Sequence, residues 1–185
     1  MQHDLDRILL DRKTIAARVH AMGEQIAADL TRDLGGDLEH GKVVIMPIMT
    51  GSMIFVADLI RELPLKLRLE LVAVSSYPGK SMESKGVKLR GELPGNLEGK
   101  HVLIIDDILD SGHTLDVVSR LVREQKPASV RLCVFLRKPG KASVDVPVDY
   151  VGFDIPDEFV VGYGLDYDGH YRNYPQIGTL RPEAR

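Results

Sequence analysis

The most informative segment of the chain is Val102-Leu103-Ile104-Ile105-Asp106-Asp107-Ile108-Leu109-Asp110-Ser111-Gly112-His113-Thr114-Leu115. It begins with four apolar residues typical of a buried strand, and two adjacent carboxylates follow at once. A third acid stands three residues later, before Ser-Gly-x-Thr and apolar residues at helical spacing. The segment therefore predicts a buried strand, a turn of small and hydroxyl residues, and a helix.

This order of residues suits the binding of a sugar phosphate. Carboxylates at the end of a buried strand are costly unless they face a cavity or a cation. The turn from Asp110 to Thr114 can offer two hydroxyls and free backbone N–H groups, where the helix dipole favours an anion. The alternative is a plain capped helix, which explains one aspartate better than three acids, a glycine and two hydroxyls. A Walker A loop is excluded because its Gly-x-x-x-x-Gly-Lys-Ser/Thr pattern is absent.

The rest of the chain alternates between short apolar strands and helical patterns. The predicted strands are Val43–Met46, Leu65–Ser75, Val102–Ile105, Val130–Leu136 and Tyr150–Ile155. The predicted helices are Ile15–Leu34, with Asp11 or Thr14 as the cap and Gly35-Gly36 at its end, a second from Gly51-Ser52 to about Leu63, and a third from Leu115 that ends by Pro127. This alternation predicts an α/β fold, a doubly wound and mostly parallel sheet with helices on both faces. Ligands of such sheets bind beyond the carboxyl ends of the strands.

Composition narrows the possible classes of protein. The 185 residues suit one domain over residues 1–185, and 44% hydrophobic with 28% charged residues indicates an ordinary globular protein. The net charge of −3 gives no reason to expect nucleic acid or an acidic membrane as a partner. The apolar runs are too short to span a bilayer, and no signal peptide is visible, so we expect a cytoplasmic protein.

Metal and thiol chemistry are also restricted by the sequence. Cys133 is the single cysteine and lies in an apolar run, so we expect a buried inert thiol and no disulfide within the chain. The six histidines are scattered without the spacing of a zinc site. A magnesium site stays open, because carboxylates and substrate oxygens suffice for Mg²⁺.

The segment 102–115 resembles the phosphoribosyl pyrophosphate signature of the type I phosphoribosyltransferases. Other segments resemble the hypoxanthine-guanine branch of that family: Ser76-Tyr77 of its active-site loop, Lys138-Pro139, Phe153–Tyr167 of its base-binding segment, and Arg172. The resemblance runs from about residue 40 to the end. It implies a purine salvage transferase that converts hypoxanthine or guanine and phosphoribosyl pyrophosphate to IMP or GMP and pyrophosphate, through an oxocarbenium-like transition state with Mg²⁺. It also implies a base-binding hood formed by the N- and C-terminal segments, a mobile loop at about 76–90, and a homodimer or homotetramer.

The resemblance further implies roles for individual residues. Asp110 would be the catalytic acid or base near purine N7, while Asp106 and Asp107 would hold the ribose hydroxyls. Contacts with phosphoribosyl pyrophosphate would come from Thr50, Gly51, Ser76, Tyr77, Asp106, Asp107, Asp110, Ser111, Gly112, His113, Thr114 and Arg172. Lys138 would donate to O6 and reject adenine, Phe159 would stack on the purine, Val160 would bind it through its backbone, and Asp166 would also lie at the purine. The candidate magnesium ligands are Asp166, Asp106 and Asp107.

Two positions depart from the family pattern. Thr50 stands where the family often has Lys or Arg, so binding there should rest on backbone N–H groups. His113 stands where the family often has Lys or Asn, and we assign it only a backbone role. In the family a peptide bond at the Thr50 position is often cis, and the sequence does not say whether Met49-Thr50 or Thr50-Gly51 is cis here.

Each residue also has a plainer interpretation. Thr50-Gly51 could be a helix start capped by Ser52, Lys138 a solvated lysine, Phe159 a core residue, Asp166 a turn residue, and Tyr77 a surface residue on a hairpin. Rival functions are a phosphoacceptor receiver domain, a transferase for another base, and a regulator of the same fold that binds RNA. In a receiver the acid pair follows the first strand, whereas here it comes mid-chain. The relative use of hypoxanthine, guanine and xanthine stays open.

Overall fold

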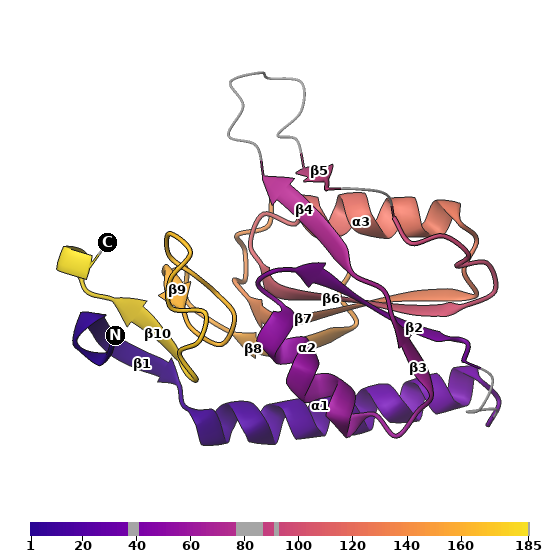
Figure 1. Ribbon diagram of the computed structural model, residues 1–185, viewed down its shortest axis with the longest axis horizontal. Coiled ribbons are helices and arrows are strands. Elements are labelled where there is room, and N and C mark those ends of the chain that lie inside the picture. The colour runs from indigo at the N-terminus through magenta and orange to yellow at the C-terminus, as the bar shows by residue number, and fades with distance from the viewer. Residues whose placement is uncertain (37–40, 77–86, 91–92, 185) are drawn as a thin grey trace.

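The computed structural model describes residues 1–36, 41–76, 87–90 and 93–184, and a larger sheet dominates it (Figure 1). This sheet has the strand order β5-β4-β2-β6-β7-β8, and β3 also pairs with β2. Its strands are β2 (Val43–Met49), β3 (Leu67–Leu69), β4 (Val72–Ser76), β5 (Val87–Leu89), β6 (His101–Leu109), β7 (Ser129–Arg137) and β8 (Tyr150–Asp154). The pairings are parallel except that of β4 with β5.

Helices cover both faces of the larger sheet (Figure 1). Helices α1 (Arg12–Asp33) and α2 (Met53–Leu59) pack on one face, and α3 (His113–Glu124) packs on the other. Alternate side chains of β6 serve the two faces: Leu103 and Ile105 join the core under α1 and α2, and Val102 and Ile104 join the core under α3. The predicted doubly wound α/β fold is confirmed.

Helix α1 follows its sequence pattern closely. The Asp11 carboxylate accepts a hydrogen bond from the Thr14 backbone N–H over 2.7 Å, so Asp11 is the cap. The buried residues of the helix recur at steps of three and four: Ile15, Val19, Met22, Ile26 and Leu30. Gly35 and Gly36, with φ of 60° and 87°, follow its end and adopt the left-handed conformation that glycine tolerates best.

Two predicted elements differ from the structure. The single strand expected over Leu65–Ser75 is divided into β3 and β4, because β3 pairs with Val43–Ile45 and β4 with Ile48–Met49 of the same strand. The second helix ends as an α-helix at Leu59 and continues as a 3₁₀ turn, Ile60–Glu62, which is common at helix ends.

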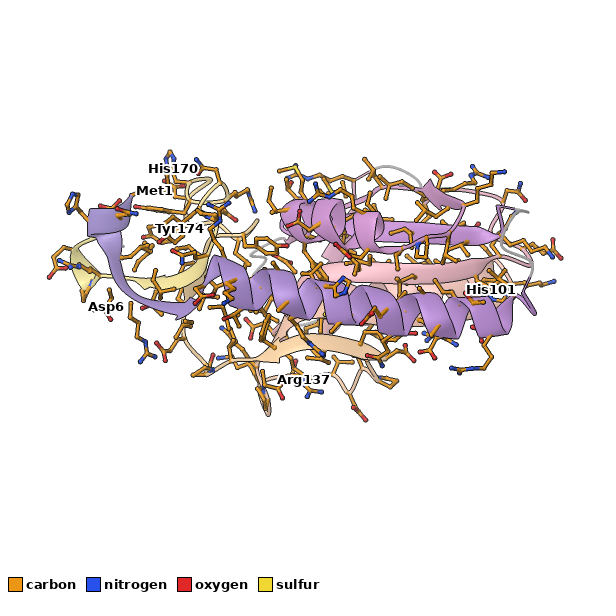
Figure 2. All side chains as sticks on the ribbon, turned by 90° about the horizontal axis from the view of Figure 1, so that it is seen from below. Met1, Asp6, His101, Arg137, His170 and Tyr174 are labelled. Carbon is orange, nitrogen blue, oxygen red and sulfur yellow. The ribbon has the colours of Figure 1, made fainter. Side chains whose placement is uncertain are left out.

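A smaller antiparallel sheet joins the two terminal segments of the chain. Its order is β1-β10-β9, formed by β1 (Leu5–Leu10), β10 (Ile177–Leu180) and β9 (Val160–Val161). Short 3₁₀ turns, Gln2–Asp4 and Pro182–Ala184, flank it. The sheet lies beyond the start of α1, and Met1 and Tyr174 are at that end of the molecule, while His101 is at the other end (Figure 2).

Two further predictions concern the state of Cys133 and the presence of membrane-spanning helices. Cys133 is fully buried, and burial raises the pKa of its thiol above the ordinary value, as an inert thiol requires. Within the described residues, no helix combines the length and the apolar character that crossing a membrane would need.

Candidate active site

A cavity of about 220 Å³ lies beyond the carboxyl ends of β2 and β6, where α/β sheets bind ligands. Its walls come from the end of β2, from β4, and from the segment that leads from β6 into α3. The predicted residues that line it are Gly51, Asp106, Asp107, Asp110, Ser111, Gly112 and Thr114. The structure therefore brings most of the predicted sugar-phosphate residues together in one place.

Asp106 and Asp107 form a crowded pair of carboxylates in this cavity. Burial and the repulsion of Asp107 raise the pKa of Asp106 well above its ordinary value. Burial also raises the pKa of Asp107, and the nearby charge of Arg172 opposes part of that rise. The Asp107 backbone N–H donates to Asp106 Oδ1 over 3.0 Å. The pair therefore gains from hydrogen-bond donors or positive charge brought by a ligand.

The turn after β2 approaches this pair closely at Gly51, so a side chain there would displace either the turn or the Asp107 carboxylate. A Cβ atom on Gly51 would lie 1.8 Å from Asp107 Oδ2. In this turn the Met49-Thr50 peptide bond is cis. The Thr50 side chain is exposed. The backbone of the turn therefore stands directly against the acid pair.

Asp110 carries an unsatisfied buried oxygen. Among the described residues, Oδ1 of Asp110 has no hydrogen-bond partner. Leaving a buried acceptor unpaired costs about 1–3 kcal/mol, so such an atom usually serves a ligand or a catalytic step. Asp110 also lines a second cavity, so it stands on the wall that the two cavities share.

The turn from Ser111 to Thr114 is shaped by Gly112. Gly112 has φ of 85°, and a Cβ atom there would lie 2.7 Å from the Val144 carbonyl oxygen. The turn leads directly into α3, whose first N–H groups have no partner within the helix. The His113 ring nitrogen Nε2 lies 3.2 Å from Ser143 Oγ, so this side chain engages a neighbouring loop. The glycine turn and the free N–H groups at the start of α3 have the geometry that suits an anion bound through the backbone.

The second cavity, of about 210 Å³, gathers the predicted purine residues. It is lined by Asp107, Ile108, Asp110, Lys138, Phe159, Val160, Leu165 and Asp166. Phe159 is 44% exposed, and its ring meets Tyr167 edge-on at 5.6 Å between centroids. An aromatic ring this exposed beside a cavity is available for stacking, so the core interpretation of Phe159 is wrong.

Lys138 differs from the solvated lysine of the plain interpretation. Its side chain is only 10% exposed, and its ammonium lies 3.4 Å from Asp157 Oδ1. Asp157 also takes a closer bond from Lys141, at 2.6 Å. Lys138 thus presents a largely buried positive charge to the second cavity.

Arg172 is not among the described residues that line the first cavity, although its charge acts on Asp107. Its Nη2 pairs with Asp166 Oδ1 at 2.7 Å, and its Nη1 donates to the Gly164 carbonyl oxygen at 2.7 Å. The other oxygen of Asp166 accepts from the Gly169 N–H at 2.8 Å. In this arrangement Arg172 supports Asp166.

The carboxylates suit magnesium only in combination with a substrate. Among the described residues, no group of three or more His, Cys, Asp or Glu side chains is placed to hold a metal by itself. Mg²⁺ is commonly held by one or two carboxylates together with substrate phosphates and water. The crowded carboxylates Asp106 and Asp107, and Asp166 nearby, fit that kind of site.

Some features of the site lie beyond the sequence predictions. The Ser76 backbone ends β4 and pairs with Val87, while Tyr77 and most of the expected 76–90 loop fall outside the described residues. Ile108 and Leu165 also line the second cavity, and Gly164 packs against Gly51; these features were not predicted from the sequence. The pair of glycines around Tyr163 was the available signal for that tight packing.

Fold and cavities together define an α/β protein with a cavity at the carboxyl ends of parallel strands that is suited to an anionic ligand. The phosphoribosyl transferase domain family matches residues 16–168. The hypoxanthine-guanine phosphoribosyltransferase of Mycobacterium tuberculosis is 42% identical over 184 residues, 98% of this chain and 89% of that protein. The hypoxanthine phosphoribosyltransferase of Escherichia coli is 38% identical over 180 residues, 97% of each chain.

Solved structures agree with these relatives. The crystal structure of a hypoxanthine phosphoribosyltransferase from Staphylococcus aureus superimposes with a TM-score of 0.88 at 38% identity, covering 99% of this chain and 95% of that one. The chain therefore belongs to the phosphoribosyl transferase family, in its hypoxanthine-guanine branch. These relatives give no support to the RNA-binding regulator.

Proposed function

We propose that the enzyme transfers the ribose 5-phosphate unit of phosphoribosyl pyrophosphate to hypoxanthine or guanine, giving IMP or GMP and pyrophosphate in purine salvage. The observation that carries this proposal is the position of Asp110 on the wall common to both cavities, with Oδ1 buried and unpaired within the described part of the chain. A bond between a sugar in one cavity and a base in the other would form beside this carboxylate.

The first cavity would hold phosphoribosyl pyrophosphate. The N–H groups from Ser111 to Thr114 would bind the 5′-phosphate, and Asp106 and Asp107 would accept hydrogen bonds from the ribose hydroxyls. The backbone of Thr50-Gly51 would face the pyrophosphate, and Arg172 would add positive charge near it. Ser76 and Tyr77, in the proposed loop at about 76–90, would cover the cavity and exclude water from the oxocarbenium-like transition state.

The second cavity would hold the purine. Phe159 would stack on the ring, Val160 would bind its edge through the backbone, and Lys138 would donate to O6. Adenine carries an amino group at that position, which would leave Lys138 without an acceptor and so select for 6-oxopurines. Asp110 would take up or share the N7 proton and stabilise positive charge at C1′.

Several finer points complete the proposal. Bound magnesium would supply positive charge to the phosphate oxygens, with Asp166, Asp106 and Asp107 as the residues that would hold it. We further propose one domain over residues 1–185, with the smaller sheet as the hood over the base, a homodimer or homotetramer, and a cytoplasmic location.

The decisive experiment measures nucleotide formation and pyrophosphate release. Each reaction contains phosphoribosyl pyrophosphate, magnesium and one base: hypoxanthine, guanine, xanthine, adenine or uracil. We expect turnover with 6-oxopurines and none with adenine or uracil. Turnover of adenine at a similar rate would reject the role of Lys138, and no turnover with any base would reject the proposed function.

A further inference from the structure

A hydrogen bond between Tyr163 and Asp58 joins two segments that are far apart in the sequence. The Tyr163 hydroxyl donates to Asp58 Oδ2 over 2.6 Å. The Tyr163 side chain is buried, and its ring packs on Phe135 with 4.8 Å between centroids. Burial and the bond to Asp58 raise the pKa of Tyr163 above its ordinary value, so the hydroxyl remains a donor near neutral pH.

The two ends of this bond lie next to different parts of the site. Asp58 belongs to α2, which begins directly after the Thr50-Gly51 turn. Tyr163 lies between Val160 and Asp166 in the segment that lines the purine cavity. At the next residue, Gly164, a Cβ atom would lie 2.1 Å from the Gly51 carbonyl oxygen. The residue after Tyr163 therefore packs directly against the Thr50-Gly51 turn, and the bond between Tyr163 and Asp58 joins the same two segments.

The backbone at Tyr163 depends on its surroundings. Its φ of 50° is uncommon for a residue other than glycine and persists only where neighbouring contacts hold it. The Tyr163 N–H donates to the Tyr174 carbonyl over 2.6 Å, and the Gly164 N–H donates to the Arg172 carbonyl over 2.9 Å. The bond from the Gly164 N–H therefore helps to fix the backbone of Arg172, and Arg172 in turn holds Asp166 through their ion pair.

We propose that Tyr163 is a positioning residue whose bond to Asp58 sets the distance between the Asp166 segment and the Thr50-Gly51 turn. The inference rests on the proposed function, in which these two segments bind the pyrophosphate and its magnesium from two sides. Without the bond each segment keeps its own fold, but their separation varies. Loss of the bond should therefore weaken the binding of the ligand that bridges the two segments, phosphoribosyl pyrophosphate with magnesium.

The test compares two tyrosines that each donate to an aspartate. Tyr163→Phe removes only the hydroxyl. Tyr150→Phe removes the hydroxyl that donates to Asp29 Oδ2 over 2.9 Å, a bond that joins α1 to β8. Calorimetry measures the affinity for phosphoribosyl pyrophosphate with magnesium, and thermal unfolding measures stability. We expect Tyr163→Phe to weaken this affinity roughly tenfold and Tyr150→Phe to leave it within about twofold, although both lower the melting temperature.

Changes at Asp58 show whether the hydrogen bond itself is responsible. Asp58→Asn keeps an oxygen that can accept from Tyr163, so we expect affinity within about threefold of the unmodified enzyme. Asp58→Ala should weaken binding at least as much as Tyr163→Phe does, because it removes this bond and also the ion pair of Asp58 with Arg61. The double variant Tyr163→Phe/Asp58→Ala should bind no more weakly than Asp58→Ala alone, because both changes remove the same bond.

Unchanged affinity in Tyr163→Phe, or an equal loss in Tyr150→Phe, would overturn the inference. Additive losses in the double variant would also overturn it. The base-turnover assay on the unmodified enzyme is read separately: ligand binding without turnover rejects the proposed function, while turnover with an unaffected Tyr163→Phe rejects this inference alone.

Discussion

The two cavities that meet at Asp110 are built in different ways. The first cavity, proposed for the sugar phosphate, takes most of its wall from one continuous segment, the end of β6 and the turn into α3. The second cavity, proposed for the purine, is assembled from separate pieces: Asp107, Ile108 and Asp110, then Lys138, residues 159–160 and residues 165–166. A continuous wall is shaped by local backbone geometry, whereas an assembled wall depends on long-range contacts. The first should therefore tolerate distant changes better than the second.

Pairing in the smaller sheet is one long-range support of the proposed purine cavity, through Val160. Val160 and Val161 of β9 pair with Thr179 and Gly178 of β10, and β10 pairs with β1. The turn from Ser111 to Thr114 has a support outside the smaller sheet, since Ser143 and Val144 donate backbone hydrogen bonds to the Ser111 carbonyl. Changes in the smaller sheet should therefore alter base binding and spare phosphoribosyl pyrophosphate.

Asp110→Asn tests a residue that lines both cavities, as Asp107 and Ile108 also do, and it should have the largest effect. The amide keeps the shape but cannot take up a proton, so we expect kcat to fall roughly 10²–10⁴-fold. Binding of phosphoribosyl pyrophosphate should change only a few-fold. Steady-state kinetics and calorimetry measure the two quantities, and equal losses in both would count against an acid or base role.

Gly51→Ala tests how strictly the continuous cavity is shaped. The added methyl group would lie 1.8 Å from Asp107 Oδ2, so the turn or the carboxylate has to move. We expect the affinity for phosphoribosyl pyrophosphate to fall on the order of 30-fold, equivalent to about 2 kcal/mol. Gly95→Ala is the matched control, because no described atom lies within 4 Å of the new methyl group. Similar behaviour of both variants would contradict the packing argument.

Lys138→Ala tests the assembled cavity. Loss of a charge-assisted hydrogen bond to O6 should raise the KM for hypoxanthine about tenfold or more, with phosphoribosyl pyrophosphate affinity unchanged. Lys141→Ala removes a lysine that binds the same Asp157 but is 45% exposed, and it should leave both values nearly unchanged. If Lys138→Ala used hypoxanthine normally, the O6 assignment would be wrong.

Gly178→Ala should have the smallest effect and addresses the smaller sheet directly. A Cβ atom there would lie 2.8 Å from the Arg7 carbonyl oxygen, so β1 has to shift away from β10. We expect the KM for the base to rise about threefold, with unchanged phosphoribosyl pyrophosphate affinity, measured by kinetics with each substrate varied in turn. A rise in the KM for phosphoribosyl pyrophosphate alone would contradict the expectation that changes in the smaller sheet alter base binding first.

The difference between the cavities also explains what could be predicted from the sequence. The strand, acids and turn from Val102 to Leu115 are neighbours in the chain, so their spacing alone indicates a phosphate site. Lys138 and Phe159 are brought together by the fold, and only the family resemblance pointed to them. The strands of the smaller sheet were missed because Ile177–Leu180 is short and its partner Leu5–Leu10 is far away in the sequence.

Close packing was equally hidden from the sequence. The glycines around Tyr163 indicate tight packing, but the local pattern does not identify Gly51 as the partner of Gly164 or Asp107 as that of Gly51, because both contacts join distant segments. The division of the expected Leu65–Ser75 strand into β3 and β4 has the same origin, since the way each part pairs with β2 decides it. Tertiary pairing overrides local preference at these places.

The smaller sheet also bears on when the enzyme becomes complete during synthesis. Strand β10 is made about 170 residues after its partner β1, at a synthesis rate of roughly 5–20 residues per second. Until then β1 has an open edge, and β9 lacks the neighbour that holds Val160 in place. Val160 in the wall of the second cavity therefore gains its backbone partner only once Ile177–Leu180 has been made.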